Sequence, residues 1–165
     1  MFPHTAYVGV GSNLGQKRDN CLRGIAALTS GGHCRLLKQS RLFRTEPVDY
    51  LDQDWFVNCV VRIETGLDPF ELLAVLQDIQ KKAGRVQDAI RFGPRILDMD
   101  VIFFDVTVID HPDLTLPHPR MHLRRFVLKP LCDMDPNLRH PILNQTVQHL
   151  LDNLEDAGQG IVEIS

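Results

Sequence analysis

The chain has 165 residues, of which 44% are hydrophobic and 24% are charged, and its formal net charge at pH 7 is −3. This composition is that of an ordinary soluble domain and excludes disordered and fibrous classes, while the negative net charge argues against a general nucleic-acid binder. The sequence has no run of 18 apolar residues, and its start lacks the basic and apolar segments of a signal peptide. We therefore expect one domain over residues 1–165 that is cytoplasmic and monomeric and binds neither nucleic acid nor membranes.

Hydrophobic periodicity in the first part of the chain predicts three strands, one helix and one long loop. In chain order these are a strand over 5–11, a helix within 12–32, a long strand over 33–45, a loop over 46–54 and a strand over 55–65. Ser12 or Asn13 is the expected helix cap, and Gly31 with Gly32 is the expected helix end. A connection of about nine residues is long for a plain hairpin, so the 46–54 loop is a candidate functional segment.

The clearest helix signals in the chain lie in residues 68–84. Asp68 is a typical N-cap, Pro69 suits the first turn, Glu71 completes a capping box, and Gly84 ends the pattern. A polar loop over 85–95 and a buried strand over 96–105 are predicted to follow.

The predicted elements up to residue 105 have the order βαββαβ. This order is typical of the ferredoxin-like α+β fold, an antiparallel sheet with both helices on one face. For the remainder we expect a short strand over 107–109, a proline-marked loop over 111–120, and additional C-terminal helices near 120–128 and 144–156. The final residues are expected to be extended or frayed.

Three motifs favour structural over functional readings. The glycines of GVGSNLG (9–15) stand between a strand and a helix but lack the spacing of a Walker phosphate loop, so a tight turn with a helix cap is preferred. His118 and His122 have the spacing of helical metal ligands, yet prolines flank His118 and no HExxH glutamate is present. The four cysteines have no CxxC spacing and are expected to be reduced, buried thiols. A hydrogen-bonding role for His118 remains open.

Asp98 and Asp100 interrupt an otherwise apolar strand. Alternate side chains of a strand share a face, so the two carboxylates are expected to lie together, which requires a cation such as a metal ion or arginine beside them. Nine of the 18 lysines and arginines lie within 81–95 and 120–129, on both sides of this pair in the sequence. The pattern favours a positively charged site that binds a polyanion together with Mg²⁺. The alternatives are that the basic clusters are two solvated faces and that the aspartates lie on an exposed edge strand without a functional role.

The stretch RFGPRILDMDVI (91–102) resembles the signature of the 6-hydroxymethyl-7,8-dihydropterin pyrophosphokinase family. The likeness covers nearly the whole chain, because further family-like motifs follow in family order. They are GSNLG (11–15), RTEPV (44–48), F-x-N (56–58), Gln77, the GR of 84–85, LTLPH (114–118) and R-x-F (124–126).

This resemblance implies transfer of diphosphate from ATP to the hydroxymethyl group of 6-hydroxymethyl-7,8-dihydropterin, with release of AMP, in folate biosynthesis. It implies two Mg²⁺ ions held by Asp98 and Asp100, which with Arg85 and Arg95 form the catalytic set. The implied ATP contacts are Gln77, Arg91, Phe92, Val101, Thr115, His118 and Arg124. The implied pterin contacts are Thr45, Glu46, Val48, Asn58 and the two ring-sandwiching aromatics Phe56 and Phe126. A role for Asp98 in taking the hydroxyl proton is a further hypothesis.

Five positions depart from the family pattern. They are Glu46, where a proline is common, Gln80, where an acidic residue is frequent, Gln87, where a loop arginine is frequent, Phe92, where a tryptophan is usual, and Pro119, where a tyrosine can follow the histidine. None removes the aspartate pair or the aromatics, but we expect weaker ATP binding than in a Gln87→Arg variant. Two rival hypotheses are a catalytically silent pterin-binding module and a metal-dependent nuclease or phosphohydrolase.

Overall fold

The computed structural model describes residues 1–84, 91–155 and 159–164. Within them a six-stranded sheet has the order β5-β1-β4-β3-β8, with β2 also paired to β4, and all of its pairs are antiparallel. The strands are β1 (His4–Ser12), β2 (Cys34–Gln39), β3 (Leu42–Thr45), β4 (Phe56–Thr65), β5 (Asp98–Phe104), β6 (Ile109–His111), β7 (Leu114–Leu116) and β8 (Ile161–Ile164). The helices are α1 (Lys17–Ser30), α2 (Pro69–Lys82), the 3₁₀ turn η1 (Met121–Leu123), α3 (Arg125–Met134) and α4 (Val147–Asp152).

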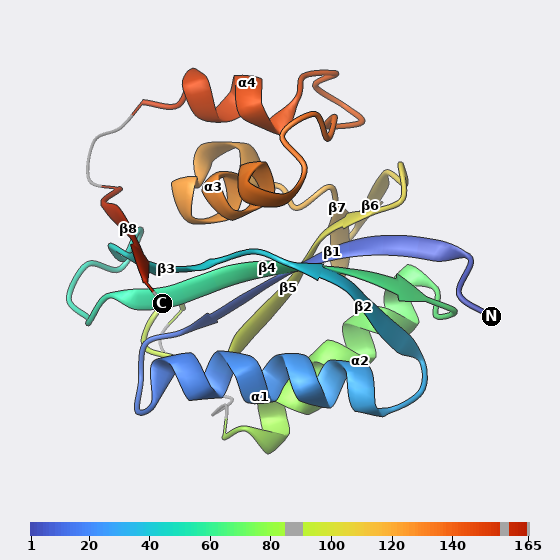
Figure 1. Cartoon of the computed structure of the whole chain (residues 1–165), viewed down its shortest axis with the longest axis horizontal. Coiled ribbons are helices and arrows are strands. Elements are labelled where there is room, and N and C mark those ends of the chain that lie inside the picture. The colour runs from blue at the N-terminus through green and yellow to red at the C-terminus, as the bar shows by residue number, and fades with distance from the viewer. Residues whose placement is uncertain (85–90, 156–158, 165) are drawn as a thin grey trace.

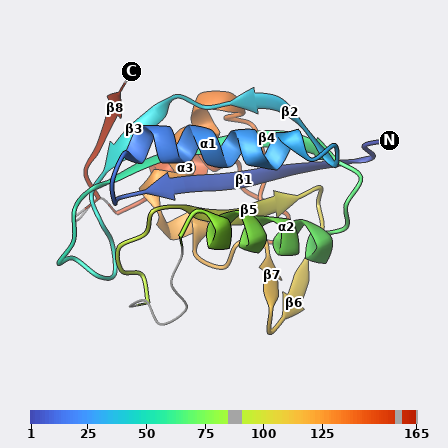
Figure 2. The ribbon, with the colours of Figure 1, turned by 90° about the horizontal axis from the view of Figure 1, so that it is seen from below.

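Helices cover both faces of the sheet. Figure 1 shows α1 and α2 below the sheet and α3 and α4 above it, and Figure 2 shows α1 and α2 side by side across the lower face. One apolar cluster joins the sheet to α1 and α2 through residues such as Ile25 and Leu72, and a second joins it to α3 and α4 through residues such as Ile102 and Leu131. The α+β class and the placement of the first two helices on one face are confirmed. The order of elements up to β5 is βαβββαβ, with one strand more than the predicted βαββαβ.

Local signals located α2 correctly. Asp68 accepts a hydrogen bond from the Glu71 backbone N–H, and Glu71 accepts one from the Asp68 N–H, which closes the predicted capping box. Gly84 follows the helix with φ +106°, a left-handed conformation that glycine adopts without strain.

Two predictions in the first half of the chain are wrong. The predicted long strand over 33–45 is two strands, β2 and β3, both of which pair with β4. Between them the Ser40 hydroxyl accepts the Val60 N–H at 2.9 Å, which interrupts the ladder with β4. Neither Ser12 nor Asn13 caps α1, whose N-cap is Gln16 without a side-chain hydrogen bond. The Asn13 amide instead contacts Gln53 and the backbone of Arg95.

The bounds predicted after residue 105 also need correction. The predicted strand at 107–109 and loop at 111–120 are a hairpin of β6 and β7, which protrudes from the lower edge in Figure 2. The helix expected near 120–128 is a 3₁₀ turn followed by α3, and the one expected near 144–156 ends at Asp152. Residues 161–164 near the chain end are extended, as expected, and pair with β3 as β8. Among the described residues, no helix is long and apolar enough to cross a membrane.

Candidate active site

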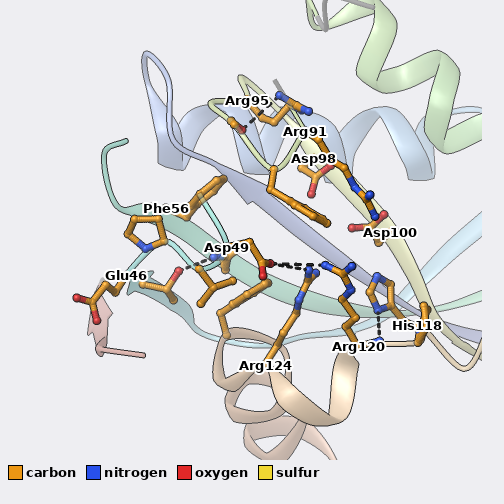
Figure 3. Close-up of a pocket in the computed structure, with 18 residues that line it drawn as sticks. Glu46, Asp49, Phe56, Arg91, Arg95, Asp98, Asp100, His118, Arg120 and Arg124 are labelled. Atoms are coloured by element: carbon orange, nitrogen blue, oxygen red, sulfur yellow. Dashed lines mark hydrogen bonds and ion pairs between the residues drawn. The ribbon is translucent and has the colours of Figure 1, made fainter. Parts of the chain in front are cut away.

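A pocket with a volume of about 390 Å³ opens between the 46–54 loop, the 91–95 segment, the start of β5 and the start of α3 (Figure 3). It gathers 13 of the predicted site residues from distant parts of the sequence. They are Thr45, Glu46, Val48, Phe56, Asn58, Arg91, Phe92, Arg95, Asp98, Asp100, His118, Arg124 and Phe126.

Asp98 and Asp100 lie on one face of β5 and both line the pocket (Figure 3). The intervening Met99 is 2% exposed and lies in the core between the sheet and helices α1 and α2. Side chains of β5 therefore alternate between the pocket and the core, as the strand prediction required. The partner strand β1 places Gly11 opposite Asp98 and Gly9 opposite Asp100. GVGS is therefore the end of a strand beside the acidic pair and forms no phosphate-binding loop.

Four arginines line the pocket with the carboxylates, and three of them gather around the ring of Phe92. The guanidinium carbons of Arg91 and Arg120 lie 4.7 Å from the ring centroid, and that of Arg124 lies 5.7 Å from it. The fourth, Arg95, is fixed by its backbone, whose N–H donates to the Asn13 side chain at 2.8 Å. Guanidinium groups bind phosphate oxygens in planar pairs, so the cluster suits a polyphosphate.

Asp49 is an acidic lining residue that the sequence reasoning did not identify. Its carboxylate lies 3.3 Å from Arg124 and 3.8 Å from Arg120. Burial lowers the pKa of Arg124, whose side chain is only 12% exposed, and the charge of Asp49 acts against that shift. Asp49 has φ +65°, so a left-handed backbone turn brings the 46–54 loop over the arginines.

His118 is a neutral hydrogen-bonding residue in this pocket. Burial, together with the charge of Arg124, lowers its pKa to about 4, so the imidazole carries no charge at pH 7. Its Nδ1 accepts the Arg120 backbone N–H at 3.2 Å, which places the remaining proton on Nε2. His122 lies beside His140 instead, with ring centroids 6.3 Å apart, so the two predicted candidates do not form a pair.

A further part of the pocket lining consists of Thr45, Phe56 and Asn58. Phe56 begins β4 and Phe126 stands in the first turn of α3, so that both aromatic side chains line the same pocket. The Asn58 amide, 8% exposed, donates to Thr45 Oγ1 at 2.6 Å, which fixes its orientation. An apolar wall with a fixed amide suits a flat ring that has donors and acceptors on its edge.

Some predicted residues lie elsewhere. Val101 points into the core on the other face of β5, Gln77 is exposed on α2, and Thr115 lies on β7, so none of the three lines the pocket. Their roles stay predictions, and Arg85 and Gln87 lie outside the described residues. Glu46 lines the pocket, but its carboxylate accepts the Gly160 N–H at 3.0 Å, and Figure 3 shows it turned away from the arginines.

Comparison with known proteins identifies the class. A relative from Methylorubrum extorquens, a 2-amino-4-hydroxy-6-hydroxymethyldihydropteridine pyrophosphokinase, is 37% identical over 158 residues, which cover 96% of this chain and 98% of the relative. A Bacillus subtilis protein of the same name is 40% identical over 129 residues, or 78% of this chain and 77% of the relative. The chain spans about a fifth of the folic acid synthesis proteins of Dictyostelium discoideum, Schizosaccharomyces pombe and Pneumocystis carinii that it also matches (23%, 21% and 20%).

The model of the 7,8-dihydro-6-hydroxymethylpterin-pyrophosphokinase family matches residues 7–136, so the chain belongs to this family. The fold agrees, since a crystal structure of wild-type Plasmodium falciparum HPPK-DHPS with pteroate gives a TM-score of 0.72 at 17% identity, over 90% of this chain and 42% of that one. A second structure, HPPK-DHPS in complex with substrates, gives a TM-score of 0.71 at 14% identity, over 90% of this chain and 43% of that chain.

Proposed function

We propose that this chain transfers diphosphate from ATP to the hydroxymethyl group of 6-hydroxymethyl-7,8-dihydropterin, giving AMP and the pterin diphosphate, in folate biosynthesis. The observation that carries the proposal is the convergence of an aspartate pair, an arginine cluster and two aromatic side chains on one pocket. Family membership supports the same reaction.

The arginines and His118 are proposed to bind the triphosphate. Arg91, Arg95 and Arg124 neutralise phosphate charge, and transfer of a phosphoryl group depends chiefly on such positioning and charge stabilisation. The neutral His118 contributes an Nε2–H donor without adding charge, because its pKa lies near 4.

Asp98 and Asp100 fit a divalent cation that also binds substrate. Among the described residues no group of three or more His, Cys, Asp or Glu side chains could hold a metal by itself. Two carboxylates suffice for Mg²⁺, which keeps several waters and commonly binds one or two carboxylates plus substrate phosphates. When bound, Mg²⁺ neutralises phosphate charge and orients the β-phosphate.

The pterin ring is proposed to lie between Phe56 and Phe126, with Asn58 at its edge. This placement brings the hydroxymethyl oxygen toward the acidic pair, where it forms a bond to the β-phosphorus while the bond from that phosphorus to the α–β bridging oxygen breaks. AMP leaves with the bridging oxygen. We assign uptake of the hydroxyl proton to Asp98, so an Asp98→Asn variant should lose metal affinity and also change the pH dependence of its residual activity.

One assay tests the function against its two rivals. The chain is incubated with ATP, Mg²⁺ and the hydroxymethyl dihydropterin, and AMP, ADP and phosphate are separated by chromatography. Release of AMP that requires pterin supports the proposal, ADP or phosphate without pterin indicates a hydrolase, and no turnover indicates a silent binding module. Asp100→Asn should abolish AMP release, whereas Asp19→Asn, an exposed aspartate on α1, is the matched control and should not.

A further inference from the structure

We propose that the segment over residues 159–164, here called the β8 segment, positions both walls of the pterin pocket and thereby sets pterin affinity without touching the pterin. This inference rests on the proposed function.

The first anchor lies at the edge of the pocket. The Glu46 backbone N–H donates to the Gly160 carbonyl at 2.9 Å, and the Glu46 carboxylate accepts the Gly160 N–H at 3.0 Å. Glu46 follows Thr45, the residue that accepts the hydrogen bond of Asn58. The anchor therefore fixes the backbone that carries one wall of the pocket.

The second anchor lies at the start of α3. Arg124, the N-cap residue, makes no side-chain capping bond, and Gln159 supplies the cap instead, accepting the Arg125 N–H at 2.8 Å. The Gln159 amide also donates to the Leu123 carbonyl at 3.2 Å. Gln159 thus holds the backbone on both sides of Arg124 and directly before Phe126.

The rest of the segment fixes these anchors in register. Ile161 to Ile164 pair with Thr45 to Leu42 of β3, and Glu163 accepts from Arg41 at 2.8 Å. Figure 1 shows β8 beside β3. Two sides of the pocket that are about 80 residues apart in sequence, from Thr45 to Phe126, are thereby tied to one short strand.

Trp55 reports on this segment directly. A Cβ added at Gly160 would lie 2.9 Å from the Trp55 ring, so the indole packs against the Gly160 backbone. Trp55 is the only tryptophan in the chain. Quenching of its fluorescence by acrylamide therefore measures whether the β8 segment is docked, independently of activity.

The test uses Glu46→Ala and Gln159→Ala, with Glu46→Gln as the conservative variant that keeps an acceptor oxygen. The control is Val162→Thr, which changes an exposed side chain on the same strand. Pterin dissociation constants are measured by calorimetry with Mg²⁺ and α,β-methylene-ATP, whose α–β bridge cannot be cleaved. KM for pterin and for ATP and kcat are measured on the same proteins, at a temperature where circular dichroism shows each to be folded.

Loss of one anchoring hydrogen bond should weaken pterin binding by about 3-fold to 10-fold. Glu46→Ala should raise the KM for pterin and the quenching of Trp55 while leaving the KM for ATP within about 2-fold, and Glu46→Gln should restore both. Gln159→Ala should raise the KM for both substrates, because Arg124 moves with Phe126. Val162→Thr should match the wild type.

The inference is overturned if the wild type turns over and both alanine variants bind pterin like it, whether or not Trp55 becomes more exposed. It is also overturned if the control weakens pterin binding equally. Absence of pterin-dependent AMP release by the wild type is a different result, since it removes the proposed function itself. Should Glu46→Ala fail to fold, Gln159→Ala alone decides the outcome, and wild-type pterin binding by Gln159→Ala then overturns the inference.

Discussion

We expect Asp49 to compete with phosphate for the arginines, so removing its charge should tighten ATP binding. Its carboxylate lies 3.3 Å from Arg124 and 3.8 Å from Arg120, where phosphate oxygens are proposed to bind. The substitution is Asp49→Asn, because asparagine has the same shape and tolerates the left-handed φ of +65° at this position.

The magnitude follows from the distance and the exposure. At an effective dielectric constant of about 20, two unit charges 3.3 Å apart attract with about 5 kcal/mol before desolvation and screening are counted. Asp49 is 41% exposed, and pairs of this kind retain on the order of 1 kcal/mol. Release of that interaction should lower the dissociation constant of ATP about 5-fold.

Titration calorimetry with ATP and Mg²⁺, in the absence of pterin, measures the effect. The gain should shrink between 50 mM and 500 mM NaCl, since salt screens the pair. Asp52→Asn, in the same loop and exposed, is the control for loss of one negative charge near the pocket. ATP binding that is weaker in Asp49→Asn would refute the reasoning, because it would show that Asp49 orients Arg124 for phosphate instead of competing with it.

Three further outcomes are expected. Gly11→Ala should weaken pterin binding at least 10-fold in calorimetry while the chain stays folded, because the new Cβ would overlap the Asn58 side-chain oxygen. Arg124→Lys should raise the KM for ATP about 10-fold, since an ammonium cannot stack on Phe92 and Phe126 while it binds phosphate. Burial lowers the pKa of His118 to about 4 and also lowers that of His140, so the unfolded chain binds more protons and the free energy of unfolding should fall as pH drops from about 6.5 toward 4. Urea titrations across this range should show that slope, and His140→Gln should reduce it.

Features encoded by neighbouring residues could be predicted from the sequence. The capping box of α2 depends on positions 68 and 71 alone, and the shared face of Asp98 and Asp100 follows from the two-residue repeat of a strand. The break between β2 and β3 could not be predicted, because it is set by Val60, 20 residues beyond Ser40. Strands of three residues such as β6 and β7 show too little alternation to be recognised.

The candidate site likewise combines residues that local motifs predict with residues whose partners are distant in the sequence. Motifs identified most of its charged and aromatic members, but neither Asp49 nor Arg120 was predicted as a site residue. Asp49 has its partners 71 and 75 residues away, at Arg120 and Arg124. The prediction that Asn13 could cap the first helix failed for a related reason. It looks like a helix cap in sequence, but tertiary contacts with Gln53 and Arg95 take up its amide.

The glycines of β1 leave open space beside the two carboxylates of the acidic pair. Gly9 and Gly11 lie opposite Asp100 and Asp98, so β1 presents no side chain beside either carboxylate. A Cβ at Gly9 would lie 3.2 Å from Ile102 Cδ1, and one at Gly11 would overlap Asn58. Under the proposed function a triphosphate, its cations and a pterin all need room at this point, so we infer that the GVG sequence is required for the space it leaves. Its resemblance to a phosphate loop is superficial, since its backbone is committed to the sheet.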